Sequence, residues 1–376
     1  MDASAALRDF FHPVDPAEIA GAVAGMHRLV RTTERASVFA RLLPWATLGT
    51  LITADALRKG QVTIARQGRP LPLEMVGSAA SGLAPEAVQA LCDQGASLVL
   101  DQVDKHVPAI AAMNAMVERY LRCDTHTNAY ASFNSESAFK AHFDGHDVLI
   151  LQLQGRKRWW CYGQKVRFPL KGQTFSTLDE LPPPEWEGVL EPGDLLYIPR
   201  GDVHRAMVEG PQSLHLTVTM IPPTGADVLT RLGQKLLHEE IGRAYLPVLA
   251  DAADRAAHQA ALRAAFHKLA DTFEIDAFLA EADRDRAPCR PMSLGLSQSV
   301  APAMRVQPAL RRRVPIAALE ARHGALSDAE QAVLALLLAE DSLTVQQLAD
   351  RLPGHDTSAA VEALARRTLV FLFADI

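Results

Sequence analysis

The feature that most constrains the fold is a change of hydrophobic period near residue 125. From there to about residue 220, apolar and polar residues alternate over short runs, such as NAYASF, KAHFD, DVLILQLQG, RKRWWCYG and SLHLTVTM. Alternation with a period of two is the pattern of a half-buried β-strand. The run LEPGDLLYIPRGDVHRAMV adds a strand, a turn and a strand, with Gly and Pro at the turns. Many short strands in one block predict a double-sheet jelly roll or barrel.

Helical periodicity lies on both sides of this block. Residues 1–120 contain PAEIAGAVAGMHRLVRTT and VPAIAAMNAMVERYL, both with apolar residues at helical spacing, and LVLDQV between them reads as a short strand. After residue 224, a run rich in Ala and Leu predicts amphipathic helices. Residues 286–310 contain several Pro and Ser residues and read as a linker, and the remainder predicts helix, turn, helix and a final strand, TLVFLF.

The predicted fold class is therefore α+β, with a double-stranded β-helix (jelly-roll or cupin) core. We expect residues 1–223 to form the barrel domain with helical N-terminal elements, residues 224–290 a helical dimerisation segment, and residues 311–376 a winged-helix-like domain. Paired helices from two chains would bury apolar stripes that one chain leaves exposed. A homodimer is the oligomeric state that this segment predicts.

Composition limits the class of partner. The net charge of −6 gives no general attraction to nucleic acid or to anionic membranes. None of the four cysteines (Cys92, Cys123, Cys161 and Cys289) falls in a CxxC pair, which disfavours a zinc knuckle and fits a reducing compartment. The N-terminal residues lack the pattern of a signal peptide, and no apolar run reaches the ~20 residues of a membrane span. We expect a cytoplasmic protein.

A histidine and an aspartate stand two residues apart in AHFDGHDVLILQLQG. Side chains at i and i+2 of a strand point to the same side, so His142 and Asp144 aim at one point. A non-haem Fe(II) site needs two imidazoles and one carboxylate on one face of the metal, with the other positions open. The third ligand is supplied by His204 in GDLLYIPRGDVHRA, after a turn, a short apolar strand and a second turn.

Other interpretations of these histidines remain open. The same sequence is compatible with a core in which His142 hydrogen-bonds to Asp144 while His204 lies on the surface. His146 shares the alternation of His142, although Gly145 is expected to bend the chain between them. His215 alternates with apolar residues in SLHLTVTM, which favours a buried histidine that hydrogen-bonds behind the ligands.

A cluster of cations and tryptophans, QGRKRWW, follows the apolar strand. Lys157 and Trp159 share one face, whereas Arg156, Arg158 and Trp160 share the other. A lysine that faces the interior of a barrel needs an anion, because an unpaired buried charge is unfavourable. The distal carboxylate of a dicarboxylate such as 2-oxoglutarate would supply it, while the 2-oxo acid end chelates iron. Arg156 and Arg158 are expected to be solvated.

With these motifs together, the chain resembles the JmjC-type Fe(II)/2-oxoglutarate oxygenases of the cupin superfamily, and within them the ribosomal oxygenase subgroup. The motif match covers roughly residues 125–220. The resemblance implies that His142, Asp144 and His204 bind iron and that Lys157 binds the distal carboxylate of 2-oxoglutarate. It further implies that the co-substrate and the substrate contact a set of polar residues: Asn128, Tyr130 and Thr217 for the co-substrate, and Tyr130, Thr219 and Asp104 for the substrate. Asp104 replaces the Asn expected there, and a carboxylate would favour a cationic partner.

The implied activity is hydroxylation of a protein or peptide side chain, with Fe(II), 2-oxoglutarate and O2. The substrate would be a ribosomal protein or a biosynthetic peptide. The alternative function is a metal-binding cupin that acts as a sensor or regulator without turnover. A transcription factor is a third possibility, but residues 311–376 contain seven Lys and Arg against nine Asp and Glu. A DNA reader gathers basic charge on one face, so DNA binding by this module is disfavoured.

Overall fold

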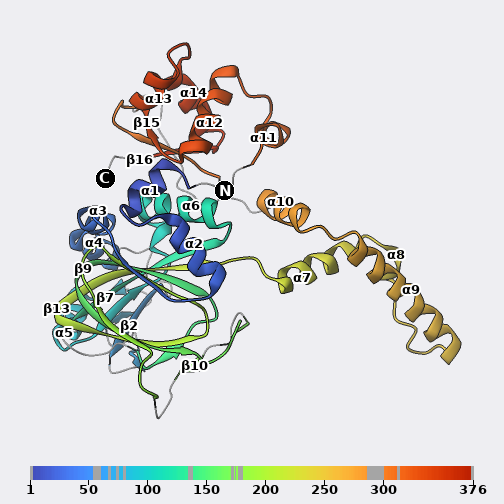
Figure 1. The fold of residues 1–376 in the computed structure, drawn as a ribbon, viewed down its shortest axis with the longest axis horizontal. Helices are drawn as coiled ribbons and strands as arrows, with labels where there is room; N and C mark the ends of the chain where they lie inside the picture. Colours follow the sequence, from blue (N-terminus) through green and yellow to red (C-terminus); the bar gives the residue numbers. More distant parts are fainter. Residues whose placement is uncertain are drawn as a thin grey trace.

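The computed structural model of the chain has a strand-rich barrel domain, a helical arm and a small C-terminal unit (Figure 1). Antiparallel strands and helices are combined, as the predicted α+β class requires. The structure describes the following residues: 3–53, 61–66, 69–72, 76–78, 82–133, 139–170, 173, 175–176, 181–285, 300–310 and 314–373. Within them, no helix has the length and apolar character that crossing a membrane requires.

The first part of the barrel domain is mixed rather than purely helical. Ser4 and Asp15 cap its first two helices through hydrogen bonds to backbone N–H groups of the first turn. The predicted LVLDQV strand is present at Ser97–Leu100, but three further strands of this part that join the main sheet, Leu29–Thr32, Val62–Arg66 and Arg69–Pro70, were not predicted. The elements are α1 (Ala5–Phe11), α2 (Pro16–Gly25), β1 (Leu29–Thr32), α3 (Ala36–Leu42), α4 (Trp45–Thr53), β2 (Val62–Arg66), β3 (Arg69–Pro70), β4 (Gly77–Ser78), β5 (Gly82–Leu83), α5 (Pro85–Asp93), β6 (Ser97–Leu100), the 3-10 helix η3 (Val103–Lys105) and α6 (Pro108–Leu121).

Apart from β4 and β5, which form a separate two-stranded sheet, the described strands of the barrel domain pair into one antiparallel sheet that folds over into two layers. In the first layer the order is β1-β12-β9-β13-β7-β6-β2-β3, and in the second β11 pairs with β9 while β8 pairs with β13 and β10. Two long strands, β9 and β13, belong to both layers and pair with each other along most of their length. The bounds of the remaining strands are β7 (Asp124–Phe133), β8 (His142–Phe143), β9 (Asp147–Gln164), β10 (Phe175–Ser176), β11 (Trp186–Leu190), β12 (Asp194–Ile198) and β13 (Asp202–Ile221).

Gly155 marks the bend of β9 between the layers. The prediction of two separate strands, DVLILQLQG and RKRWWCYG, was wrong, because both lie in β9 and are joined by this bend. Likewise DVHRAMV and SLHLTVTM are one strand, β13, with a register shift between Glu209 and Ser213. Gly155 has a φ of +65°, and a Cβ there would lie 2.0 Å from the carbonyl oxygen of Gln212. Only glycine fits this close crossing of the two strands.

The two faces of the first layer have different roles. Leu149, Leu151 and Leu153 of β9 and alternate residues of β13 face the N-terminal helices and form the main hydrophobic core. Val148 and Ile150 face the other way, where they pack with Trp159 of the second layer. The second face of the first layer therefore lines the space between the two layers.

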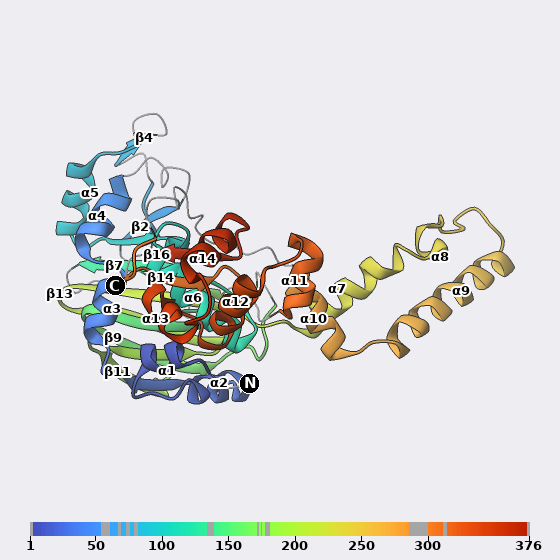
Figure 2. The same ribbon diagram turned by 90° about the horizontal axis from the view of Figure 1, so that it is seen from above.

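The helical arm projects away from the barrel domain in both views (Figures 1 and 2). Salt bridges from Glu281 to Arg231 and Lys235 join its first and last helices. Large apolar side chains along it are exposed, including Tyr245 and Leu249, each 98% exposed. Its elements are α7 (Gly225–Leu236), α8 (Glu240–Arg243), α9 (Ala252–Asp271) and α10 (Ile275–Asp285).

The C-terminal unit combines four helices with a three-stranded sheet in the order β15-β14-β16. Strand β14 lies within the predicted linker 286–310, so the predicted C-terminal boundary of the linker was wrong. Residues 286–299 lie outside the described residues. The final strand, β16, matches the predicted TLVFLF strand. The elements are β14 (Arg305–Pro308), α11 (Ile316–His323), α12 (Asp328–Glu340), β15 (Leu343–Thr344), α13 (Val345–Arg351), α14 (Thr357–Arg366) and β16 (Val370–Phe373).

A buried ion pair fixes the C-terminal unit to the barrel domain. Arg119 of α6 donates from Nε to Asp341 Oδ1 at 2.5 Å and from Nη1 to the carbonyl oxygen of Leu310 at 2.8 Å, and both charged side chains are buried. Phe371 and Phe373 pack against Ala112 of the same helix. Figures 1 and 2 accordingly place the C-terminal unit beside α1 and α6.

Gly155→Ala is expected to destabilise the barrel domain. A left-handed conformation costs a non-glycine residue about 1–3 kcal/mol, and the clash with Gln212 adds to that cost. We expect the free energy of unfolding in urea to fall by at least about 2 kcal/mol. Gly21→Ala in α2, where a Cβ meets no atom within 4 Å, should instead leave stability unchanged or raise it by about 0.5–1 kcal/mol. Equal stabilities of the two variants would contradict the role of the bend.

Candidate metal centre

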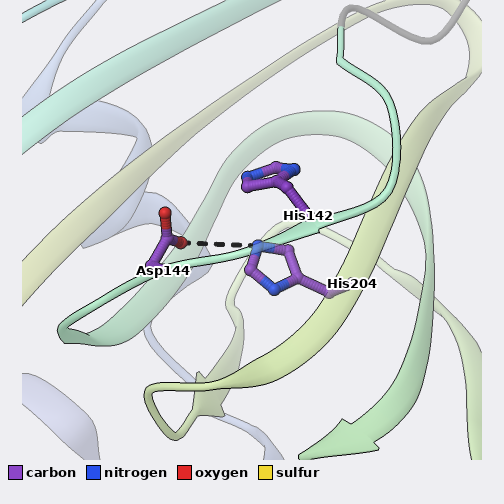
Figure 3. Close-up of side chains that lie close together, drawn as sticks. All are labelled: His142, Asp144 and His204. Atoms are coloured by element: carbon purple, nitrogen blue, oxygen red, sulfur yellow. Dashed lines mark ion pairs between the residues drawn. The ribbon is translucent and has the colours of Figure 1, made fainter. Parts of the chain in front are cut away.

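Two histidines and one aspartate converge between the layers. His142 lies on β8, Asp144 follows the end of that strand, and His204 lies on β13, where it pairs with His142 across the strands. One ligand atom from each residue lies within 4.8 Å of the others, and Asp144 Oδ2 is 3.6 Å from His204 Nε2. Figure 3 shows the three side chains pointing toward a common point. The structure thus brings together the three predicted ligands.

Backbone carbonyl groups orient both imidazole rings. Nδ1 of His142 lies 2.9 Å from the carbonyl oxygen of Lys140, and Nδ1 of His204 lies 3.0 Å from that of Asp202. A carbonyl only accepts, so each Nδ1 carries the proton and donates it. In each ring Nε2 is left with a lone pair, which is the arrangement of a metal-binding imidazole.

The electrostatic environment keeps His204 neutral. Burial, followed by the neighbouring His142, lowers the pKa of His204 to about 4, although Asp144 opposes the shift. A neutral imidazole at pH 7 can donate its lone pair to a cation without first losing a proton.

Hydrogen bonds tie the turn before His204 to the segment that carries Asp144. The backbone N–H of Gly201 donates to the carbonyl oxygen of Asp144 at 3.0 Å, and that of Arg200 donates to Asp147 Oδ1 at 2.8 Å. Gly201 has a φ of +82°, and a Cβ there would lie 1.9 Å from a backbone oxygen. The carbonyl oxygen of Asp202 accepts the hydrogen bond from His204 Nδ1, and its carboxylate pairs with Arg28 Nη2 at 2.8 Å. The segment that carries Asp144 and the turn before His204 are therefore bonded to each other.

A cavity of about 240 Å³ opens beside the three ligands, between the two layers. Residues of β7, the first half of β9 and the second half of β13 line one wall, and residues of β8 and the other halves line the opposite wall. The lining residues are His126, Asn128, Tyr130, Phe139, His142, Asp144, His146, Val148, Ile150, Lys157, Trp159, His204, Ala206, His215, Thr217 and Thr219.

Lys157 is buried at the inner end of this lining. Its Nζ donates to Ser132 Oγ at 3.0 Å and lies 3.4 Å from His215 Nδ1. Burial lowers the pKa of Lys157 to about 7, and burial together with Lys157 holds the pKa of His215 well below its usual value. Arg158 faces outward, where it pairs with Glu187 and Glu209 at 2.8 Å each. A single cationic side chain of this strand thus enters the cavity.

Other polar residues share the cavity with Lys157. The Tyr130 ring stacks on the His215 ring with centroids 4.9 Å apart and an interplanar angle of 8°, and the Tyr130 side chain hydrogen-bonds to Asn128. Burial raises the pKa of Tyr130, so the phenol stays protonated and can donate. Thr217 pairs with Asn128 across the strands, and Thr219 pairs with His126. These side chains form the polar floor of the cavity.

Asp104 is placed differently from the other predicted contacts. It lies in η3, is buried, and accepts a hydrogen bond from the backbone N–H of Thr127 through Oδ1 at 2.8 Å. Asp104 is not one of the residues that line the cavity. Its carboxylate supports β7 from behind. His146 does line the cavity, with its ring centroid 6.2 Å from that of His126, but it is outside the cluster of three ligands.

Sequence reasoning did not single out Ser132, which accepts a hydrogen bond from Lys157, or His126 and Phe139, which line the cavity. Alternation along β7 contained a signal for the first two, because 126, 128, 130 and 132 share one face of that strand. Phe139 had no such signal, since it lies outside the regular strands.

The donor set suits a divalent transition metal. Two imidazole nitrogens and one carboxylate oxygen on one side of an ion leave the cavity side open to other ligands, which is the facial arrangement of non-haem Fe(II) sites. Closed structural zinc sites instead surround the ion with four protein ligands. The residues present therefore fit an iron centre that admits small molecules.

Comparison with known proteins identifies the domain. Residues 102–228 match the family model described as the JmjC domain. The chain is 33% identical over 140 residues to the bifunctional lysine-specific demethylase and histidyl-hydroxylase NO66 of Culex quinquefasciatus, with 36% of this chain and 22% of that protein covered. The corresponding protein of Drosophila willistoni is 30% identical over 185 residues, with 48% and 24% covered. The chain thus spans about a quarter or less of the length of these relatives.

Solved structures share the fold over nearly the whole chain. The X-ray structure of E. coli ycfD has a TM-score of 0.58 at 16% identity and covers 96% of this chain and 99% of that one. The complex of YcfD, a ribosomal oxygenase from Escherichia coli, with cobalt and 2-oxoglutarate has a TM-score of 0.52 at 18% identity, with 92% and 94% covered. The resemblance to JmjC-type oxygenases is confirmed, and so is the barrel fold of the cupin type.

His204→Ala is expected to abolish tight metal binding while the fold persists. Loss of an outer hydrogen-bonding partner already costs about 10–100-fold in metal affinity, so loss of a ligand should cost more than about 100-fold. The measurement is calorimetric titration of the purified protein with Co(II) or, without oxygen, Fe(II). His146→Ala is the matched control, because this residue lines the same cavity outside the ligand cluster. The assignment is wrong if His146→Ala loses the metal and His204→Ala keeps it.

Proposed function

We propose that this chain is an Fe(II)- and 2-oxoglutarate-dependent hydroxylase that acts on a protein or peptide side chain. The observation that supports it best is the combination of the His142, Asp144 and His204 cluster with a buried lysine in one cavity. A sensor that only holds a metal needs the ligands, but it has no need of a buried cation beside an open coordination site.

His142, Asp144 and His204 would hold the iron, and the open side would face the cavity. When bound, Fe(II) with 2-oxoglutarate and O2 supplies the oxidation: one oxygen atom enters a C–H bond of the substrate, and the other enters the succinate that forms with loss of CO2. The protein contributes ligand geometry, exclusion of water and placement of the substrate.

Lys157 is the proposed anchor of 2-oxoglutarate. Among the described residues, its ammonium group hydrogen-bonds to Ser132 Oγ and lies beside the ring of His215, and burial lowers its pKa to about 7. A carboxylate at this position would pair with the ammonium and keep it protonated. Asn128, Tyr130 and Thr217 line the same cavity and can donate to the oxygen atoms of the co-substrate.

The substrate would enter past the outer lining of the cavity, where Thr219 lies close to His126. Because the similar proteins are named as a histidyl-hydroxylase and a ribosomal oxygenase, side chains of ribosomal proteins are the first class to be tried. Asp104 is withdrawn from the proposed substrate contacts, since its carboxylate bonds to the backbone of β7.

The helical arm is the proposed dimerisation segment. Its described residues expose Leu229, Tyr245, Leu246, Val248 and Leu249, an amount of apolar surface that a second arm would cover. A winged-helix assignment of the C-terminal unit, its lack of DNA binding and a cytoplasmic location stay predictions.

Lys157→Ala is expected to raise the apparent KM for 2-oxoglutarate by about 100-fold or more. Breaking a buried ion pair by removing one partner costs roughly 3–5 kcal/mol, and every 1.4 kcal/mol is about tenfold. The measurement is succinate release by the Fe(II)-loaded protein over a 2-oxoglutarate titration, which also tests whether there is turnover at all.

Arg158→Ala is the control, because its guanidinium group pairs with two glutamates outside the cavity, and its KM should stay near that of the wild type. Metal affinity should change little in either variant. If Arg158→Ala has the raised KM and Lys157→Ala behaves like the wild type, the co-substrate binds elsewhere. If no preparation releases succinate, the sensor function is favoured.

Leu249→Asp, in the segment between α8 and α9, is expected to convert a dimer into a monomer, because a charge on apolar surface that a second arm would cover becomes an unpaired buried ion. Light scattering after gel filtration at micromolar concentration measures the mass. Leu170→Asp, at an exposed leucine outside the arm, should remain dimeric. A wild-type protein that is already a monomer would reject the proposed role of the arm.

A further inference from the structure

A second cavity lies where the C-terminal unit meets the helices of the barrel domain. Its volume is about 270 Å³, and it shares no lining residue with the cavity beside the candidate metal centre. Three parts of the chain contribute to its wall: α1 with α3, helix α6, and the sheet of the C-terminal unit. Figures 1 and 2 agree in placing these elements side by side. The proposed hydroxylase reaction uses none of them.

Aromatic, thioether and small aliphatic side chains form the apolar part of the wall, whereas Asp9, Arg41 and Arg305 bring charged side chains to its more exposed side. Phe10 comes from α1, Phe373 from β16, and Met113 and Met116 from α6. Methionine sulfur and aromatic rings both make favourable contacts with a flat aromatic ring. A cavity of roughly 150 Å³ already binds a benzene molecule, so this one has room for two fused rings.

Two buried polar side chains of the wall carry atoms that need a partner. In the part of the chain that the structure describes, Gln307 Oε1 and Ser342 Oγ form no hydrogen bond, although Gln307 is fully buried and Ser342 is 9% exposed. Gln307 Nε2 donates to the carbonyl oxygen of Ala112 at 2.9 Å, which sets the orientation of the amide and leaves Oε1 as the acceptor. Buried polar atoms in native proteins usually have a partner, so a missing one points to a bound molecule.

The strand register places these two side chains next to each other. Val306 of β14 pairs with Leu343 of β15 in an antiparallel ladder, so Ser342 falls opposite Gln307. Residues opposite each other on neighbouring strands have Cβ atoms about 5 Å apart. One polar group of a ligand can therefore reach both.

We infer that this junction cavity binds a neutral aromatic alcohol of one or two rings. A hydroxyl group is both a donor and an acceptor: it would donate to Gln307 Oε1 and accept from Ser342 Oγ, while the ring packs between Phe10, Phe373 and the two methionines. A carboxylate would face the Gln307 oxygen with a second acceptor, and a hydrocarbon would leave both polar atoms without a partner.

Such a ligand would touch both sides of the junction. It would lie against α6, whose Arg119 already holds the C-terminal unit through Asp341. The same helix supports β7, because Asn114 accepts a hydrogen bond from Thr127 Oγ at 2.7 Å and Glu118 accepts one from the backbone N–H of Thr125 at 3.1 Å. The ligand would therefore strengthen the docking of the C-terminal unit on a helix that supports a strand of the candidate metal centre.

The test uses the full chain with 13C-labelled methionine methyl groups and 2-naphthol as the probe. We expect the Met113 and Met116 methyl signals, assigned by Met→Leu variants, to shift in a saturable way. 2-Methoxynaphthalene, the methyl ether of the probe, has no O–H group to donate to Gln307 Oε1. It should bind at least about tenfold more weakly than 2-naphthol. Ser342→Ala should weaken 2-naphthol about threefold to tenfold.

Two further variants separate this cavity from other sites. Ala109→Phe fills the cavity from its partly exposed edge and should remove the shifts of Met116 with the fold intact by circular dichroism. His204→Ala should bind 2-naphthol like the wild type, because the two cavities share no residue. The inference is overturned if the two methyl signals stay still up to the solubility limit of the probe, which would mean that the cavity holds water only. Equal binding of the alcohol and its methyl ether overturns the proposed hydrogen bonds.

Discussion

The close crossing of β9 and β13 at Gly155 is the constraint on which the rest of the structure depends. Both strands run from one layer of the sheet into the other, so each supplies residues to both walls of the cavity. Before the bend, even-numbered residues of β9 such as Ile150 face the cavity; after it, odd-numbered ones such as Lys157 do. Because of the bend, odd-numbered leucines before it pack against the N-terminal helices. After it, an odd-numbered charged side chain enters the cavity.

Several buried charged side chains are held in ion pairs. Arg119 is paired with Asp341 and capped by a carbonyl oxygen, and Asp202 is paired with Arg28. Lys157 differs, because in the described part of the chain its ammonium group contacts a hydroxyl group and a histidine ring rather than a carboxylate. A buried ammonium in such surroundings loses stability relative to its neutral form. A site with this property is ready for an anionic ligand, in agreement with the proposed binding of a dicarboxylate.

Helix α6 links the parts of the molecule. One of its faces contacts the C-terminal unit through Arg119 and Ala112, and another bonds to β7 through Asn114 and Glu118. The C-terminal unit is therefore not a freely tethered module but is packed on the element that supports the cavity. Its net acidic composition and this packing favour a structural role within the chain.

The sequence by itself determined the class of fold and the three candidate metal ligands. The period of two between residues 125 and 220 predicted the strands, and the spacing of His142 and Asp144 with a distant turn and His204 predicted the cluster, because local alternation decides which side chains share a face. Only the tertiary structure decided which walls those faces form. The bend at Gly155, the hydrogen bond from Lys157 to Ser132 and the support of β7 by Asp104 all join segments through long-range register or packing. The pairing of Arg119 with Asp341 spans 222 residues, and no local pattern in the chain encodes a contact at that separation.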